Sequence, residues 1–150
     1  MEKGEKINAA VRDLFSSQSL AVLSTQQQGR PYASLVAFVA SNDLRYIYFV
    51  TPKTTRKFAN LTANPSVAFI VNNSINQASD FHQAIAVTGV GEAEEISGPQ
   101  RKRILKHYLE KHPYLEEFAK SPTCGLVCVT VRSYYMVKNF QNVMELHLSK

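Results

Sequence analysis

The residues best suited to binding chemistry lie where a strand-like run ends and a short helical run begins. The run Thr54–Lys57 brings two hydroxyls, a guanidinium and an ammonium to a point just after the strand that ends at Thr51. The first N–H groups of a helix have no intrahelical acceptor, and the helix dipole is positive at this end. The junction therefore predicts a phosphate-binding site, with an ordinary solvated helix start as the alternative.

Hydrophobic spacing predicts the elements that position this junction. In chain order these elements are a helix at Ile7–Phe15, strands at Leu20–Thr25, Tyr32–Ala40 and Leu44–Thr51, a helix at Lys53–Thr62, strands at Val67–Val71 and Gln83–Glu95, a helix carrying Ile104–Leu109, and strands at Cys124–Val131 and Tyr134–Phe140. About six strands with short connections predict a mainly β (α+β) fold, a six-stranded antiparallel Greek-key barrel with flanking helices. Residues 1–150 are expected to form one domain.

Local sequence signals add detail at three places: within a strand, at a helix start and in a loop. Gly89 and Gly91 predict a bulge or a close backbone approach in the long fifth strand. Ser97 and Gln100 have the spacing of a capping box, with Ser97 as the N-cap of the next helix. The polar segment 72–80 is predicted to be a loop.

The second strand is apolar on both faces. Leu35–Ala40 contains no polar side chain, whereas a strand with one wet face alternates apolar and polar residues. Something besides the barrel interior must cover its outer face. A partner subunit or a flat ligand would do so.

Composition limits the function classes. Lys and Arg exceed Asp and Glu by 17 to 12, which favours an anionic ligand without choosing between a phosphate and a nucleic acid. Cys124 and Cys128 are four residues apart in one strand and cannot bridge each other, and the charged start lacks an apolar signal segment, so we expect a cytoplasmic protein. No apolar run is long enough for a membrane helix.

Catalytic and metal signatures are weak. The four histidines are scattered without metal-ligand spacing, which predicts that they are surface residues and that no metal is bound. Cys124 lies in an apolar strand without the electropositive setting of a reactive thiol. Glu145 and His147 share a face if the C-terminal tail is extended.

With these residues in view, the chain resembles the pyridoxamine 5'-phosphate oxidase-like family, the FMN-binding split barrels. The segments that carry the resemblance are Gly29–Tyr32, Phe49–Thr51, Thr55–Lys57, Asn64–Val67 and Gly91–Glu94. Their order and spacing are specific, although each segment is short.

The resemblance implies a homodimer with FMN in clefts between the subunits. It places the phosphate on Thr55, Arg56 and Lys57. The residues that it places beside the ring are Ser34, Leu35, Val36, Ala37, Val50 and Thr51, with Gln83 as a further flavin contact. A flat ring with polar edges suits a slot of aliphatic side chains and backbone groups.

The sequence also departs from the family pattern. Val39 stands where vitamin B6 phosphate oxidases have a basic residue, and the family's tryptophan and arginine-histidine substrate motif are missing. We therefore expect an FMN-dependent oxidoreductase whose small-molecule substrate and catalytic residues stay open. The alternatives are a non-catalytic carrier or sensor of flavin, haem or a deazaflavin cofactor, and a basic barrel that binds single-stranded nucleic acid.

Overall fold

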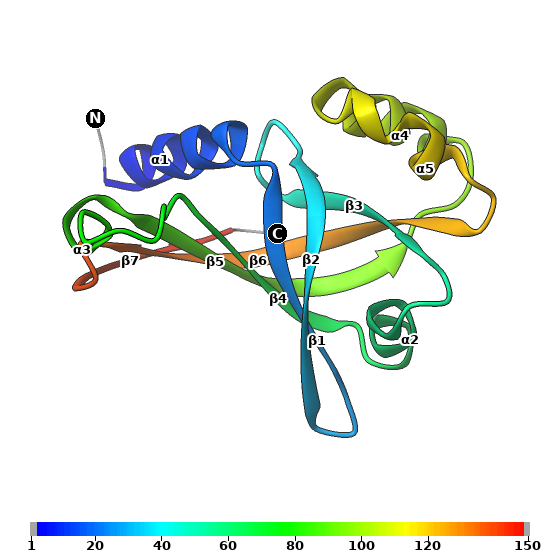
Figure 1. Cartoon of the computed structure of the whole chain (residues 1–150), viewed down its shortest axis with the longest axis horizontal. Coiled ribbons are helices and arrows are strands. Elements are labelled where there is room, and N and C mark those ends of the chain that lie inside the picture. The colour runs from blue at the N-terminus through cyan, green and yellow to red at the C-terminus, as the bar shows by residue number, and fades with distance from the viewer. Residues whose placement is uncertain (1–2, 149–150) are drawn as a thin grey trace.

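In the computed structural model, which describes residues 3–148, seven strands form one antiparallel sheet and six of them close into a barrel (Figure 1). The strands are β1 (Leu20–Gln27), β2 (Arg30–Ala40), β3 (Tyr46–Pro52), β4 (Ser66–Asn72), β5 (Ile85–Glu95), β6 (Cys124–Lys138) and β7 (Asn142–His147). Their order is β3-β2-β1-β4-β5-β6-β7, and the pairing of β3 with β6 closes the barrel. The order β4-β1-β2-β3 is a Greek key, so the predicted fold is confirmed, with β7 as one extra strand.

The helices cover the barrel ends and one outer side. They are α1 (Lys3–Ser17), α2 (Arg56–Ala63), α3 (Asp80–Gln83), α4 (Gln100–Lys111), the 3-10 turn η1 (Pro113–Leu115) and α5 (Glu116–Lys120). Figure 1 shows α1 on one side of the β1–β2 hairpin and α4 with α5 on the other. The helix expected at Ile7–Phe15 forms, and the one expected at Lys53–Thr62 begins only at Arg56, because Thr55 is its N-cap. Residues 1–2 and 149–150 of the expected domain lie outside the described residues.

Strand alternation divides the apolar side chains between two cores. Val36 and Phe38 of β2 point into the barrel, where Phe15 of α1 meets the rings of Phe38 and Tyr134 at centroid distances of 5.5 and 5.6 Å. Val39 of β2 points outward into a second core beneath α4 and α5. The residues of the second core include Tyr48, Val50, Tyr108, Leu126 and Cys128.

The last third of the chain differs from its sequence prediction in how the strands are divided. Residues 124–138 form one strand, not two, because β5 pairs with β6 on both sides of a register shift between Val90 and Gly91. The shift leaves Arg132 as the extra residue of a bulge, and a Cβ on Gly91 would lie 2.0 Å from the Thr130 carbonyl oxygen. The predicted bulge and close approach are both present.

The predicted capping box is wrong. The helix begins at Gln100 with Pro99 as N-cap, and no side chain caps it. Gly98 has a φ of +87°, in the left-handed region that favours glycine. Because this turn intervenes, the helix starts too late for Ser97 to cap it.

Among residues 3–148, no helix is long and apolar enough to cross a bilayer.

Candidate cofactor-binding site

A split in the barrel separates β2 from β3. The two strands pair only at Phe38–Ala40 with Ile47–Phe49, after which β2 continues beside β1 and β3 beside β6. In an uninterrupted ladder Ala37 would lie opposite Val50, and Val36 opposite Thr51. The residues predicted to border a flavin ring therefore line the two sides of this split, where backbone groups lack a strand partner among the described residues.

The junction predicted to bind a phosphate forms a helix start after the end of β3. Thr55 is the N-cap of α2, and its hydroxyl accepts from the Phe58 N–H at 3.3 Å and donates to the Pro52 carbonyl at 3.0 Å. The Thr51 hydroxyl oxygen lies 3.0 Å from the Thr55 hydroxyl oxygen. This hydroxyl is occupied in holding the turn, so the groups left for an anion are the side chains and first-turn N–H groups of Arg56 and Lys57.

Both cations lack a carboxylate. The Arg56 guanidinium lies 5.5 Å from the centroid of the Tyr32 ring, beside a cavity of about 300 Å³ that Arg30 and Asn60 also line. Burial lowers the pKa of Lys57. No ion pair joins either residue to an acidic side chain of residues 3–148. A partly buried cation without a counter-ion favours an anionic ligand at this end of the split.

The hydroxyl of Ser34 is a buried polar group without a partner. Its Oγ has no hydrogen bond to any described residue. Ser34 shares a face of β2 with Tyr32, two residues nearer the hairpin turn, and with the core residue Val36. Buried hydroxyls nearly always have a partner, so this orphan fits a site that a polar ligand completes.

The predicted ring-bordering residues do not all present side chains to one surface. Val36 is buried in the barrel core, whereas Leu35 points outward and is 63% exposed. Ala37 packs against the second core, as does Val50 across the split. A flat ligand in the split would contact the side chains that point toward it. It would contact only the backbone of the residues whose side chains point the other way.

Gln83 is not brought to this site. It lies in α3, which Figure 1 places at the opposite end of the molecule from α2. The fifth strand begins at Ile85 and not at Gln83 as expected, because the chain first makes this short helix. Within one chain, Gln83 is separated from the other predicted contacts.

Two side chains of α4 and His112, the residue that follows it, contact backbone carbonyls of β2 beside the split, and the sequence did not predict them. The Tyr108 hydroxyl donates to the Ala37 carbonyl at 3.1 Å, and His112 Nε2 lies 2.7 Å from the Phe38 carbonyl. His107 Nε2 lies 2.9 Å from the Ala40 carbonyl. The expectation that every histidine is a surface residue is therefore wrong for His112, which is buried. The recurrence of Tyr108 and His112 on one helical face was the available signal.

Burial sets the ionisation of these groups. It raises the pKa of Tyr108 to about 12 and lowers the pKa of His112. Both side chains therefore stay neutral near pH 7, as suits partners of backbone carbonyls.

The cysteines offer no nucleophile. Cys124 and Cys128 are buried and unbridged, and burial raises the pKa of Cys128 to about 12. Within the described part of the chain, no group of three or more His, Cys, Asp or Glu side chains is placed to hold a metal ion.

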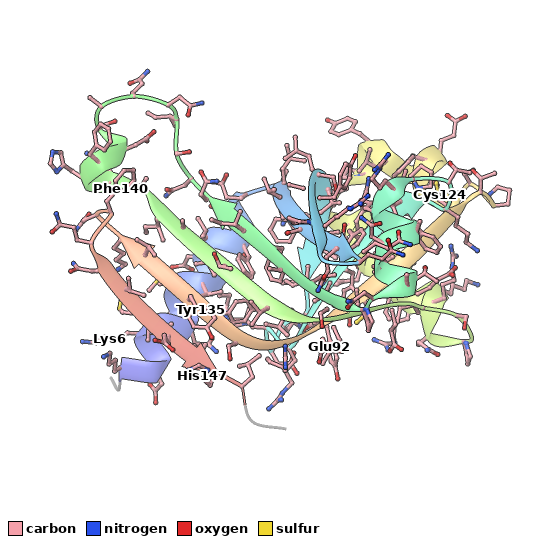
Figure 2. All side chains as sticks on the ribbon, turned by 90° about the horizontal axis from the view of Figure 1, so that it is seen from below. Lys6, Glu92, Cys124, Tyr135, Phe140 and His147 are labelled. Atoms are coloured by element: carbon pink, nitrogen blue, oxygen red, sulfur yellow. The ribbon has the colours of Figure 1, made fainter. Side chains whose placement is uncertain are left out.

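A broad sheet face beside the split stays uncovered. Leu35 of β2 and Leu20 of β1, which is 53% exposed, lie on the same outer face as Val143 of β7. Figure 2 shows Tyr135 and His147 on the neighbouring strands β6 and β7. His147 lies 2.6 Å from Ser133 Oγ through Nδ1 and 3.1 Å from Glu145 through Nε2, so Glu145 and His147 share a face as predicted.

Comparisons with known proteins agree with this architecture. A sequence profile of the family described as pyridoxamine 5'-phosphate oxidase matches residues 7–138. A search of curated protein sequences found no match.

Three solved structures share the fold at low identity. A haem-binding protein from Mycobacterium smegmatis has a TM-score of 0.80 and 14% identity over 91% of this chain and 55% of its own. HutZ, the haem storage protein of Vibrio cholerae, has a TM-score of 0.73 and 15% identity over 91% and 92%. An FAD-binding protein from Mesorhizobium loti has a TM-score of 0.66 and 14% identity over 85% and 90%.

Proposed function

The chain belongs to the pyridoxamine 5'-phosphate oxidase family, and from this membership we propose that it binds FMN and acts as a flavin-dependent oxidoreductase on a small molecule. The observation that carries the proposal is the coincidence of two features. A barrel split with unpaired strand edges ends at two cations, Arg56 and Lys57, that have no carboxylate partner. A ring with polar edges and a phosphate at one end matches this arrangement.

The residues of the chain would bind and orient the cofactor. Arg56 and Lys57 would hold the phosphate, with the α2 dipole adding to their charge. The Ser34 hydroxyl would gain a polar partner that it lacks, and the β2 and β3 edges would position the ring. Bound FMN would supply hydride or electron transfer, so no dedicated acid or base is required of the protein.

We also propose that the site is completed by a second copy of the chain. The outer face around Leu35 and Leu20 is apolar and uncovered, which favours an isologous dimer across it. In such a dimer the Gln83 of one chain can serve only the flavin of the other, because α3 is remote from α2 within a chain. Two buried free thiols support the expected cytoplasmic location.

Flavin titration of purified protein tests the phosphate site. Lys57→Ala should weaken FMN by about ten- to hundredfold, since a hydrogen bond to a charged group is worth about 1.5–3 kcal/mol. Lys53→Ala is the matched control, because the Lys53 ammonium already pairs with Glu95 at 3.0 Å and should leave the affinity unchanged. Equal FMN affinity in the wild type and Lys57→Ala would contradict the assignment.

Haem is the second candidate cofactor, because two of the similar structures are a haem-binding and a haem storage protein. His147 lies on the uncovered face and would serve as an axial ligand only if its Nε2 left Glu145, because its Nδ1 contacts Ser133. The absorption spectrum of the purified protein separates a flavin from haem or a deazaflavin. Nucleic acid is less well supported, since Tyr48 is buried and stacks on Tyr46 within the protein.

A further inference from the structure

A second cationic cavity lies at the far end of β2 from the hairpin turn. It is enclosed by α1, the turn after β2 and the last part of α4, and its volume is about 240 Å³. Arg12 of α1 and His107 and Lys111 of α4 line it. Three basic side chains thus converge from two helices that are about 95 residues apart in sequence.

No carboxylate lines this cavity. Asp43 lies between the lining residues Asn42 and Leu44 without being part of the lining, and it accepts from the Ser41 hydroxyl and the Arg45 N–H. Glu110 lines the separate groove between α4 and α5. Asp13 is next to Arg12 on α1 but is not part of the lining. No ion pair joins Arg12 or Lys111 to an acidic side chain among the described residues.

The cations still have donors to offer. Lys111 Nζ donates to the Phe15 carbonyl at 2.8 Å and lies 3.9 Å above the Phe38 ring, which leaves a further N–H for the cavity. Arg12 donates to the Asn42 carbonyl and to Asn8, so part of its five-donor guanidinium is free. The Ser16 hydroxyl at the cavity wall has no hydrogen bond to a described residue.

We propose that this cavity binds a compact phosphate-type oxyanion between Arg12, Lys111 and Ser16. A tetrahedral anion accepts from donors that approach from different directions, as these three do from α1 and α4. The volume is smaller than the roughly 300–1,000 Å³ of ordinary small-molecule sites, so inorganic phosphate or the phosphate end of a larger molecule fits better than a whole cofactor. The anion would join α1, the turn after β2 and α4, and it is distinct from the phosphate proposed at Arg56 and Lys57.

Lys111 reports on occupancy of the cavity. Burial lowers its pKa to about 8, so about one tenth is free amine at pH 7 and open to acylation. A bound anion would raise this pKa again, and the free-amine fraction at pH 7 falls about tenfold for each unit by which the pKa rises.

The test is trace acetylation of the whole protein at pH 7 with acetic anhydride, followed by mass spectrometry of the peptides. Titration with inorganic phosphate, against chloride at matched ionic strength, should slow Lys111 acetylation about tenfold or more and saturate. Lys102, exposed on the same helix, is the internal reference. Equal protection of Lys102, or none at Lys111, would overturn the proposal.

Two variants and a control localise the effect. Arg12→Gln should abolish the protection, and Ser16→Ala, which removes only an exposed hydroxyl, should weaken phosphate about two- to tenfold. Lys106→Gln removes a charge from α4 outside the cavity and should change nothing. Protection that persists unaltered in both cavity variants would overturn the site. Because Lys57 lies on a different peptide, failure here and failure of the FMN site are read separately.

Discussion

At the scale of single residues, a substitution at Ser34 tests whether its buried hydroxyl binds a ligand or stabilises the fold. A buried hydroxyl without a partner costs stability, about 1–3 kcal/mol for a fully desolvated group, so replacing it with a methyl-sized side chain removes that cost. Ser34→Ala should therefore leave the cofactor-free protein as stable as the wild type or more stable, while it weakens FMN binding.

Urea unfolding of the cofactor-free protein and flavin titration measure the two effects. Ser97→Ala in the turn before α4 is the control and should leave FMN affinity unchanged, because Ser97 is exposed and caps no helix. Loss of stability in Ser34→Ala without any change in flavin affinity would show that the hydroxyl serves the fold alone.

Residue types predicted the charge of the phosphate junction but not the task of each group. Arg56 and Lys57 are unpaired, as a ligand site requires, while the Thr55 hydroxyl is taken up by Phe58 and Pro52. A threonine before a helix has the same sequence signature whether it caps the helix or binds an anion. Only the positions of the neighbouring backbone groups distinguish these tasks.

At the scale of elements, Gly91 controls the pairing of β5 with β6. A Cβ at this position would lie 2.0 Å from the Thr130 carbonyl oxygen, and backbone in the middle of a sheet cannot move aside easily. Gly91→Ala should lower the free energy of unfolding by about 2–3 kcal/mol.

Gly4→Ala is the control for this substitution. No atom lies within 4 Å of a Cβ built on Gly4, which sits in the first turn of α1. The variant should gain up to about 1 kcal/mol from the reduced entropy of the unfolded chain. Chemical denaturation measures both variants, and a Gly91→Ala protein as stable as the wild type would contradict the close approach of β5 and β6.

Hydrophobic periodicity predicted most helices and strands but not where one strand ends and the next begins. The strand β6 runs through Arg132 and Ser133, where the polar pair had indicated a break, because a bulge at Arg132 keeps both flanks paired with β5. The extra strand β7 has weak alternation of its own and forms because the β6 edge is left free beyond Thr130, which pairs with Tyr46, the first residue of β3. Both outcomes depend on a partner strand and not on local propensity.

At the scale of the whole molecule, the uncovered sheet face predicts the oligomeric state. Leu35→Lys places a charge on that face, and each change acts twice in an isologous dimer. Loss of about 1.5–3 kcal/mol per buried leucine should weaken the dimer about a hundredfold or more, and FMN binding with it.

Sedimentation velocity over a concentration series measures this effect. Tyr114→Lys is the control, since Tyr114 is 98% exposed on η1 beside α4 and α5, away from the face in question. A Leu35→Lys protein that sediments like the wild type would remove this face as the interface.

The sequence by itself determined the family, the barrel topology, the β1–β2 hairpin and the cationic junction after β3. These features depend on neighbouring residues, whose spacing sets backbone geometry and the face that each side chain occupies. The tertiary structure alone decided that β2 and β3 part beyond the pair Phe38–Phe49, that Tyr108 and His112 contact carbonyls of β2, and that Arg12 and Lys111 share a cavity. Such contacts join segments far apart in the chain, so they arise from how the elements pack and leave no local pattern to read.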